Sequence, residues 1–160
     1  MRAVGLPRVA AIAAGGSHTY ALAVDGSVWR WGQTGTTMDF GEDNPRYRPA
    51  RMDGLPAIVE IAAGGSHACG RTAAGALYCW GNNSFGQLGR PPGDSGGSEG
   101  PSLVAGLPPV TGVALGFYFS CAITGRGAEA AAYCWGDNGW GQLGDGTTER
   151  RHAPVRVAIP

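Results

Sequence analysis

Four cysteines are the residues of this sequence best suited to covalent or metal chemistry, and they form two pairs. Cys69 is paired along the chain with Cys79, and Cys121 with Cys134. Neither pair has the close Cys-x-x-Cys spacing of a zinc knuckle, so we expect no metal site. Two interpretations remain for each pair: a disulfide, or two buried free thiols.

Two histidines have neighbours that could suggest catalysis, but the rest of a catalytic site is missing. His18 and His67 each follow a serine, yet no third group is placed to orient either histidine as a general base. The Gly-Gly pairs before them do not open a helix, which a phosphate-binding loop requires. The sequence contains no lysine for a Schiff base. We therefore expect no enzyme activity, no cofactor, and histidines that hydrogen-bond within their own repeats.

The composition argues against two further classes of function. Twelve arginines balance twelve acidic residues, so the formal net charge is zero. A general nucleic-acid binder would need an excess of positive charge, and we expect no nucleic-acid partner. No apolar run approaches the roughly 20 residues of a membrane span, so we expect no membrane insertion.

Three sequence repeats must position these side chains. They occupy residues 5–53, 54–105 and 106–160 of a single repeat domain, 1–160, and each begins with Gly-Leu-Pro. The apolar residues alternate with a period of two around turns such as Asp25-Gly26, which is typical of β-hairpins. The 29 glycines and 11 prolines are too many for a helical bundle. Short strands recurring in this way predict propeller blades.

The repeated motifs resemble those of the regulator of chromosome condensation family. Gly-Gly-Ser-His stands at 15–18 and 64–67, and Asn-x-x-Gly-Gln-Leu-Gly at 83–89 and 138–144. The resemblance covers nearly the whole chain and implies a β-propeller. Three blades are too few for a closed ring of about four to eight. We therefore expect an all-β fold of three propeller blades, either an incomplete propeller or one subunit of an assembled ring.

The repeats differ from one another at several aromatic residues. The third repeat has Phe117-Tyr118-Phe119 where the others have Gly-Ser-His. Phe85 and Trp140 share one repeat position, where the first repeat has Thr36. Loop aromatics on a rigid sheet are typical anchors of protein interfaces, and the alternative is that they pack between neighbouring blades. The candidate partner-binding residues are Phe85, Phe117, Tyr118, Phe119 and Trp140.

Counting along the second hairpin favours disulfides. A turn at Ala73–Gly75 places Cys69 opposite Cys79 at a non-hydrogen-bonded position, where Cα atoms lie about 4.5–5.5 Å apart. The first repeat has Tyr20 and Arg30 at the same two places, so the cysteines are gained or lost as pairs.

Disulfides would place the parent protein in the extracellular space or the periplasm. The apolar segment 1–14 could be mistaken for a signal peptide. Because residues 5–18 align with residues 54–67, we interpret this segment as the first blade.

The first functional hypothesis is a non-catalytic scaffold that binds a protein partner through its blade loops. The resemblance implies a second candidate, since family members include guanine-nucleotide exchange factors for a small GTPase. It also implies a third, a secreted enzyme inhibitor like the propeller-type β-lactamase inhibitory protein. The predicted disulfides favour an exported scaffold or inhibitor over a nuclear exchange factor.

The two end blades are expected to promote self-association. Each would have one face without a neighbouring blade, and we expect these outward faces to carry Val28 and Val113. Copies could then associate head to tail, and two chains forming a six-bladed closed ring is the simplest case.

Overall fold

The computed structural model describes residues 5–33, 48–93 and 98–158, which form three four-stranded antiparallel sheets. The first blade contains β1 (Val9–Ala14), β2 (His18–Ala23), β3 (Val28–Gly32) and β4 (Ala50–Arg51). The second contains β5 (Glu60–Ala63), β6 (His67–Arg71), β7 (Leu77–Asn82) and β8 (Ser98–Leu103). The third contains β9 (Val110–Leu115), β10 (Phe119–Thr124), β11 (Ala131–Gly136) and β12 (Arg151–Arg156). The predicted all-β fold of three propeller blades is confirmed.

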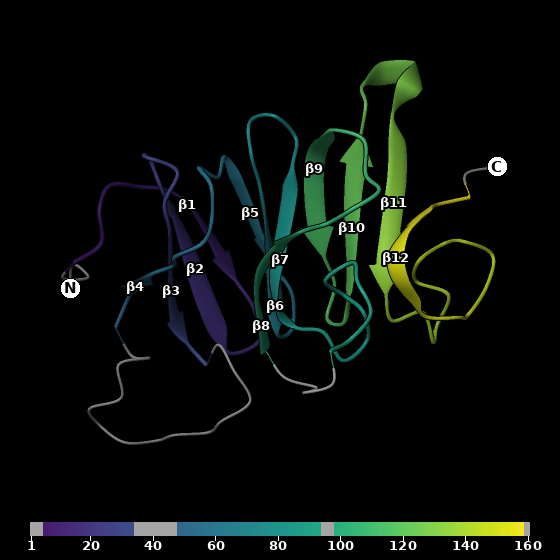
Figure 1. Ribbon diagram of the computed structural model, residues 1–160, viewed down its shortest axis with the longest axis horizontal. Coiled ribbons are helices and arrows are strands. Elements are labelled where there is room, and N and C mark those ends of the chain that lie inside the picture. The colour runs from purple at the N-terminus through teal and green to yellow at the C-terminus, as the bar shows by residue number, and fades with distance from the viewer. Residues whose placement is uncertain (1–4, 34–47, 94–97, 159–160) are drawn as a thin grey trace.

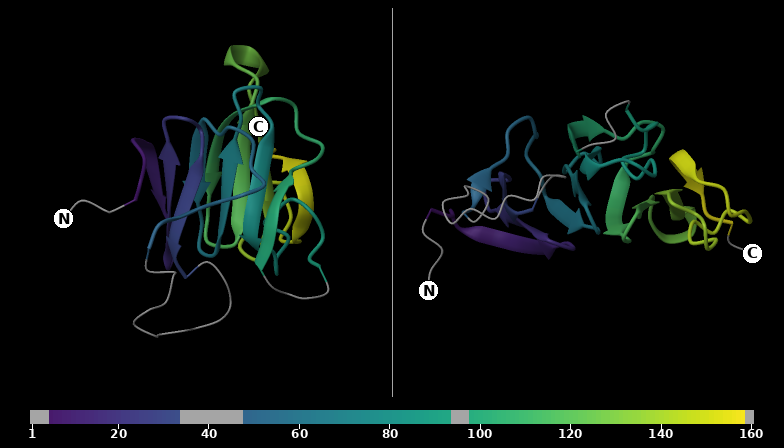
Figure 2. Two further views of the ribbon diagram at one scale, coloured as in Figure 1. Left: turned by 60° about the vertical axis from the view of Figure 1, so that its left-hand side comes forward. Right: turned by 90° about the horizontal axis from the view of Figure 1, so that it is seen from below.

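The three blades stand side by side in an open row (Figures 1 and 2). Each blade is an up-and-down meander in which neighbouring strands follow one another in the chain. The first strands of the blades are neighbours, because β1 contacts β5 and β5 contacts β9. The first and third blades lie at opposite ends of the row, and the ring is not closed.

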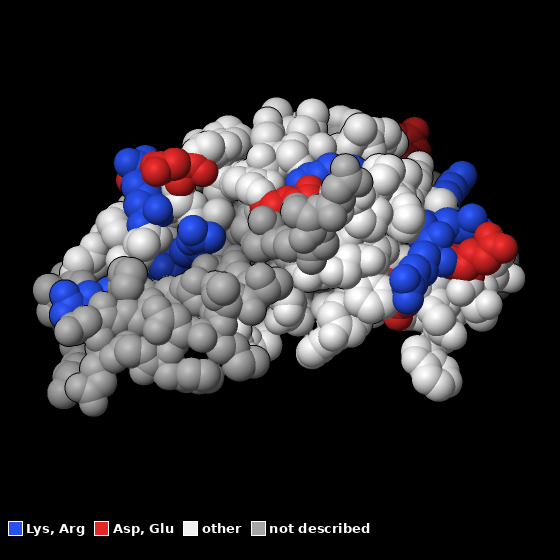
Figure 3. All heavy atoms as spheres, turned by 60° about the horizontal axis from the view of Figure 1, so that its bottom comes forward, with Lys and Arg blue, Asp and Glu red and all other residues white. Residues whose placement is uncertain are grey.

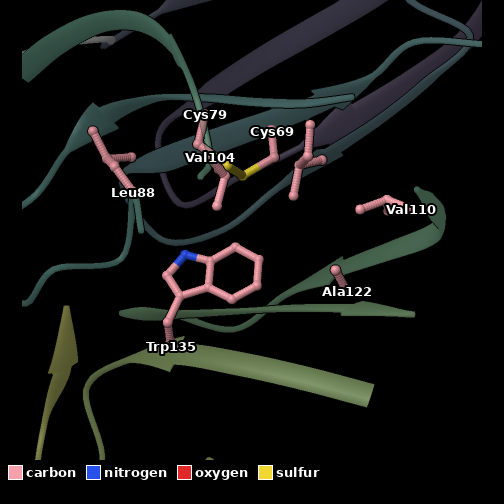
Figure 4. Close-up of a cluster of buried hydrophobic side chains, with 8 residues drawn as sticks. Cys69, Cys79, Leu88, Val104, Val110, Ala122 and Trp135 are labelled. Carbon is pink, nitrogen blue, oxygen red and sulfur yellow. A yellow bond between two sulfur atoms is a disulfide. The ribbon is translucent and has the colours of Figure 1, made fainter. Parts of the chain in front are cut away.

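The apolar cores lie between the blades, and Figure 4 shows the one between the second and third blades. Alternation along a strand sends successive side chains to opposite faces, so a middle blade needs two apolar faces. On β6, Ala68 faces the first blade and Cys69 faces the third. The first junction buries Tyr20, Leu22, Val28, Ile58, Ala68 and Trp80. The second junction buries Cys69, Leu77, Cys79, Leu88, Val104, Val110, Ala122 and Trp135.

Main-chain contacts fix each blade against the next at the hairpin turns. The amide of Ile58 donates a hydrogen bond to the carbonyl of Gly26 at 3.0 Å, and Val110 donates to Gly75 at 2.9 Å. Gly75 has φ of +84°, and a Cβ there would lie 2.8 Å from the Cβ of Pro109. Glycine therefore suits this turn twice, because it adopts the left-handed conformation and lets the next blade approach.

The prediction that Val28 and Val113 lie on the outward faces of the end blades is wrong. Val28 is 1% exposed in the first junction, and Val113 packs against the second junction. The outward apolar residues are instead Ile12 on β1 and Ile123 on β10, which are 66% and 50% exposed. Alternation separates two faces of a strand, but it does not say which face meets which neighbour.

Within the described residues, the only helix is the single 3-10 turn Gly127–Glu129, labelled η2. No helix among them is long and apolar enough to span a membrane.

Candidate protein-binding surface

Three aromatic rings from two blades form one cluster at the loop end of the second and third blades. Phe85 stacks on Tyr118, with ring centroids 4.5 Å apart and planes inclined by 21°. Phe117 meets Tyr118 edge-on, also at 4.5 Å. The guanidinium carbon of Arg150 lies 4.4 Å from the centroid of Phe85, which is a cation–π contact. We call Phe85, Phe117, Tyr118 and Arg150 the aromatic patch.

The aromatic patch is open to solvent and yet held by ordered strands. Phe117 is 60% exposed and Tyr118 is 36% exposed, while Phe85 is half-buried beneath Tyr118. Phe117 and Tyr118 lie in the turn between β9 and β10, and Phe85 lies in the loop after β7. The patch can therefore offer an apolar contact to a partner with little loss of conformational freedom.

The loop that carries Phe85 is shaped by two buried polar side chains. The Asn83 Oδ1 accepts a hydrogen bond from the Leu88 amide at 3.0 Å. The Gln87 Oε1 accepts one from the Phe85 amide at 2.9 Å. Leu88 is fully buried, so the loop is anchored at its apolar end and bonded at its exposed end.

The corresponding loop of the third blade repeats this design around Trp140. The Asn138 Oδ1 accepts from the Leu143 amide at 3.0 Å, and the Gln142 Oε1 accepts from the Trp140 amide at 2.8 Å. These bonds explain why Asn-x-x-Gly-Gln-Leu-Gly recurs. Nearby, a hydrogen bond from Arg151 holds the pKa of Asp145 well below its usual range.

The other two predicted aromatic residues do not join the aromatic patch. Trp140 is 93% exposed, because it occupies the position of Phe85 in a blade with no following neighbour. Phe119 begins β10 at the repeat position of His67, and its half-buried ring packs closely on Gly116. The structure thus brings together three of the five predicted residues.

The two cysteine pairs bridge the second and third strands of their blades. Cys69 faces Cys79 with Sγ atoms 2.07 Å apart, and Cys121 faces Cys134 with Sγ atoms 2.14 Å apart. Both Cα separations are 4.1 Å, shorter than the expected 4.5–5.5 Å. Cys69 and Cys79 are sealed inside the second junction, whereas Cys121 is half-buried on the outer face of the third blade.

The expectation that the histidines hydrogen-bond within their own repeats is wrong for His67. Its Nε2 lies 2.8 Å from the Ser120 hydroxyl of the next blade. That hydroxyl donates to the carbonyl of Gln87, which also accepts from the Trp135 indole. Burial lowers the pKa of His67 to about 4 and also lowers the pKa of His18. Both rings are therefore neutral at pH 7, as a buried histidine without an acidic partner should be.

Sequence reasoning did not identify Arg150, Gln87 or Ser120 as members of these sites. Gln87 recurs as Gln142 in the third repeat, and this repetition could have indicated that the glutamine shapes the loop. Ser120 gave none, because the second repeat has Ala68 at its position and its partner His67 lies far away in the chain.

On the face shown in Figure 3, charged side chains lie in a few separate groups, several of which combine arginine with acidic residues. Ion pairs join Arg90 to Glu99 at 2.6 Å and Arg151 to Asp145 at 2.7 Å. The described residues contain no cluster of three or more histidine, cysteine or acidic side chains placed to hold a metal.

Solved structures of known propellers resemble this one over nearly the whole chain. Prp20p from Saccharomyces cerevisiae, studied with its binding to Gsp1p and histones, is 26% identical with a TM-score of 0.79. The match covers 97% of this chain and 39% of that chain. Yeast RCC1 (Prp20) bound to Kap60 gives 26% identity and a TM-score of 0.76, over 97% of this chain and 38% of that chain.

Human WBSCR16 has the same fold, with 24% identity, a TM-score of 0.75, and coverage of 95% of this chain and 40% of that chain. The present chain spans about two fifths of the length of these structures. Sequence comparison agrees, since a profile of the regulator of chromosome condensation (RCC1) repeat matches residues 74–123 and 129–160. A second profile of this repeat matches residues 58–87 and 110–142. With three propeller blades and repeat matches over more than half its length, the chain belongs to the RCC1 repeat family.

Proposed function

We propose that this chain is a non-catalytic scaffold that binds a protein partner through the aromatic patch. The main support is that Phe117 and Tyr118 expose aromatic surface in a fixed arrangement. Tyr118 stacks on Phe85, and Phe117 packs edge-on against Tyr118. Interface hot spots are enriched in aromatic residues and arginine, which is the composition of the patch. Prp20p, a relative of the same fold, is described with its binding to Gsp1p and histones.

The test measures binding of purified chain to Gsp1p and to core histones. We expect Phe117→Ala and Tyr118→Ala to weaken binding by about 1–4 kcal/mol with little loss of stability. Phe119→Ala should instead destabilise the fold by about 1–2 kcal/mol, because its half-buried ring packs against the turn. Ser84→Ala, in an exposed position next to Phe85, is the matched control. If only folding changes and every variant binds equally, the patch is not the binding surface.

Guanine-nucleotide exchange on a small GTPase is the second candidate, favoured by the likeness to Prp20p. Exchange would require the chain to accelerate nucleotide release, and a release assay with purified GTPases measures this directly. Binding without accelerated release would retain the scaffold and exclude the exchange factor.

Inhibition of a secreted enzyme is the third candidate, favoured by the two disulfides. They also support an oxidising compartment, extracellular or periplasmic, for the parent protein. A panel that includes β-lactamases tests inhibition. Patch variants should lose any inhibition in parallel with binding.

We also propose that copies of the chain self-associate through the outer faces of the first and third blades. Both faces expose apolar residues, with Ile12 and Ile123 at 66% and 50% exposure. Burying such surface favours association. Sedimentation of the wild-type chain at micromolar concentration measures it, and a closed ring of two chains is the simplest assembly.

A further inference from the structure

The outer face of the first blade matches a face that is buried at both junctions. On β1, Val9 is 42% exposed and Ile12 is 66% exposed. The residues at these repeat positions in the second blade are Ile58, which is 2% exposed, and Ile61, which packs on the first junction. We call this outer face, with Val9, Ile12 and the preceding Leu6-Pro7, the leading face.

The outer face of the third blade corresponds, by repeat position, to the face of the first blade that is buried against the second blade. Ile123 is 50% exposed, while Leu22 at the same repeat position of the first blade is 3% exposed within the first junction. We call this outer face, with Ile123 and Cys121–Cys134, the trailing face. It is hollowed by a groove of about 380 Å³ lined by Ala130, Ala131, Ala132, Arg156, Val157 and Ala158.

At the second junction, the corresponding surface of the second blade is covered by residues of the third blade. There the strands around Leu77 and Val104 form the matching surface, and Leu107 and Pro109 of the third blade lie against them. Leu107 belongs to a Gly-Leu-Pro segment that also occurs at 5–7, where Leu6 is half-buried. Ala132 stands at the repeat position of Leu77, and its smaller side chain leaves the groove at the trailing face.

We propose that the trailing face of one copy docks on the leading face of a second copy, whose Leu6 enters the groove as Leu107 does at the second junction. This rests on the proposed self-association, keeps its head-to-tail polarity, and adds the segment that enters the groove and the face that receives it. The chain itself packs a trailing surface on a leading surface at its two junctions, and the contact between copies would repeat that interface.

The loop end of the new junction must be wider than the two existing ones. The Gly65 amide donates to the Phe117 carbonyl at 3.1 Å, and a Cβ on Gly65 would lie 2.6 Å from that oxygen. At the trailing face this position holds Phe117, so the neighbouring turn must sit farther out. Trp140, which is 93% exposed, lies at the position that contacts the next blade and faces the small, exposed Gly16 and Ser17 of the second copy.

Two arginine substitutions test the polarity by mixing. Ile12→Arg blocks the leading face, Ile123→Arg blocks the trailing face, and neither residue is buried. Each variant alone should be a monomer in sedimentation at concentrations where the wild type assembles. An equimolar mixture should form a 1:1 complex, because one variant keeps its trailing face and the other its leading face. Leu103→Arg is the matched control, since Leu103 is 55% exposed on the middle blade and Arg156 holds its position in the third.

Any other result contradicts either the head-to-tail polarity or self-association itself. A variant that still assembles alone means that like faces meet, and it overturns the head-to-tail polarity while keeping self-association. A mixture that stays monomeric also overturns the polarity. A wild type that is monomeric at every concentration overturns self-association itself, before any variant is compared. Thermal unfolding of each variant checks that the blades remain folded.

Disulfide reduction gives a second measurement that does not depend on mass. Association should slow reduction of Cys121–Cys134 at least severalfold, because docking covers the trailing face. Cys69–Cys79 is the internal control, since it is already fully buried within the chain. Equal reduction rates for Cys121–Cys134 in monomer and assembly would place the contact elsewhere.

Discussion

The two blade junctions use one main-chain arrangement and fill it with different chemistry. At the first, Tyr20 packs edge-on against Trp80 with ring centroids 5.6 Å apart. At the second, the Cys69–Cys79 disulfide takes the register of Tyr20 and packs with Trp135. The hydrogen bonds that amides of the next blade donate to the hairpin-turn carbonyls are nevertheless the same, at 3.0 and 2.9 Å.

The polar groups of the two junctions differ as well. Ser120 links His67 to the Gln87 carbonyl at the second junction, whereas the first has Ala68 at that position. Among the described residues, the Trp80 indole nitrogen has no hydrogen-bond partner, while that of Trp135 donates to Gln87. The comparison teaches that backbone contacts set the blade spacing and that side chains set how strongly each junction holds.

Removing the tryptophan of the second junction should have the largest effect. Trp135→Ala deletes a fully buried ring and its hydrogen bond, and should cost about 3–5 kcal/mol of the free energy of unfolding. Trp31→Ala is the matched control, because the same repeat position on the open first blade is only half-buried. Its cost should be about 1–2 kcal/mol. Equal costs in urea unfolding would mean that the junction does not strengthen the blade.

Acid should weaken the second junction through His67. Its pKa is about 4 in the folded chain and about 6.5 in the unfolded chain, so only the unfolded chain takes up the proton between these values. Stability is therefore fully present above pH 6.5 and falls by about 3 kcal/mol as pH drops to 4. His67→Phe, the residue type at Phe119, should flatten this part of the profile. A slope that survives the substitution would assign it to another group.

The disulfides should contribute similarly to stability but differ in accessibility. Mass spectrometry of unreduced protein should show Cys69–Cys79 and Cys121–Cys134 links, each stabilising the fold by about 2–3 kcal/mol. In a limited dose of reductant, monomeric chain should lose Cys121–Cys134 first, because Cys121 is half-buried and Cys69 is sealed. Four free thiols after oxidising purification would contradict the pairing and the proposed compartment.

The smallest effect should come from making the second junction resemble the first. Ser120→Ala introduces the residue found at Ala68 and should cost about 1–2 kcal/mol, because buried His67 loses its hydroxyl partner. Ser84→Ala on the surface should change the unfolding midpoint very little. A cost below that of the control would show that the polar links add nothing to packing.

Sequence patterns could predict what depends on short distances along the chain. The facing of Cys69 and Cys79 follows from the length of one turn, and the strands follow from alternation. The stack of Phe85 on Tyr118 depends on how two blades sit together, which no hairpin rule determines. The contact of His67 with Ser120 is of the same kind, since the partners are 53 positions apart in the sequence. The assignment of Val28 to an outward face failed for this reason.

The turn-to-strand hydrogen bonds have a consequence for how such a chain can evolve. The carbonyls of Gly26 and Gly75 accept hydrogen bonds from main-chain amides of the next blade. This contact therefore does not depend on most of the side chains. A duplicated blade would therefore form the same main-chain contact with its neighbour at once, before its side chains had changed. Mutation could then exchange a tyrosine and arginine for a pair of cysteines, or a Gly-Ser-His turn for three aromatic residues. Lineages built from these units can in this way acquire new recognition surfaces while the order of stacking is retained.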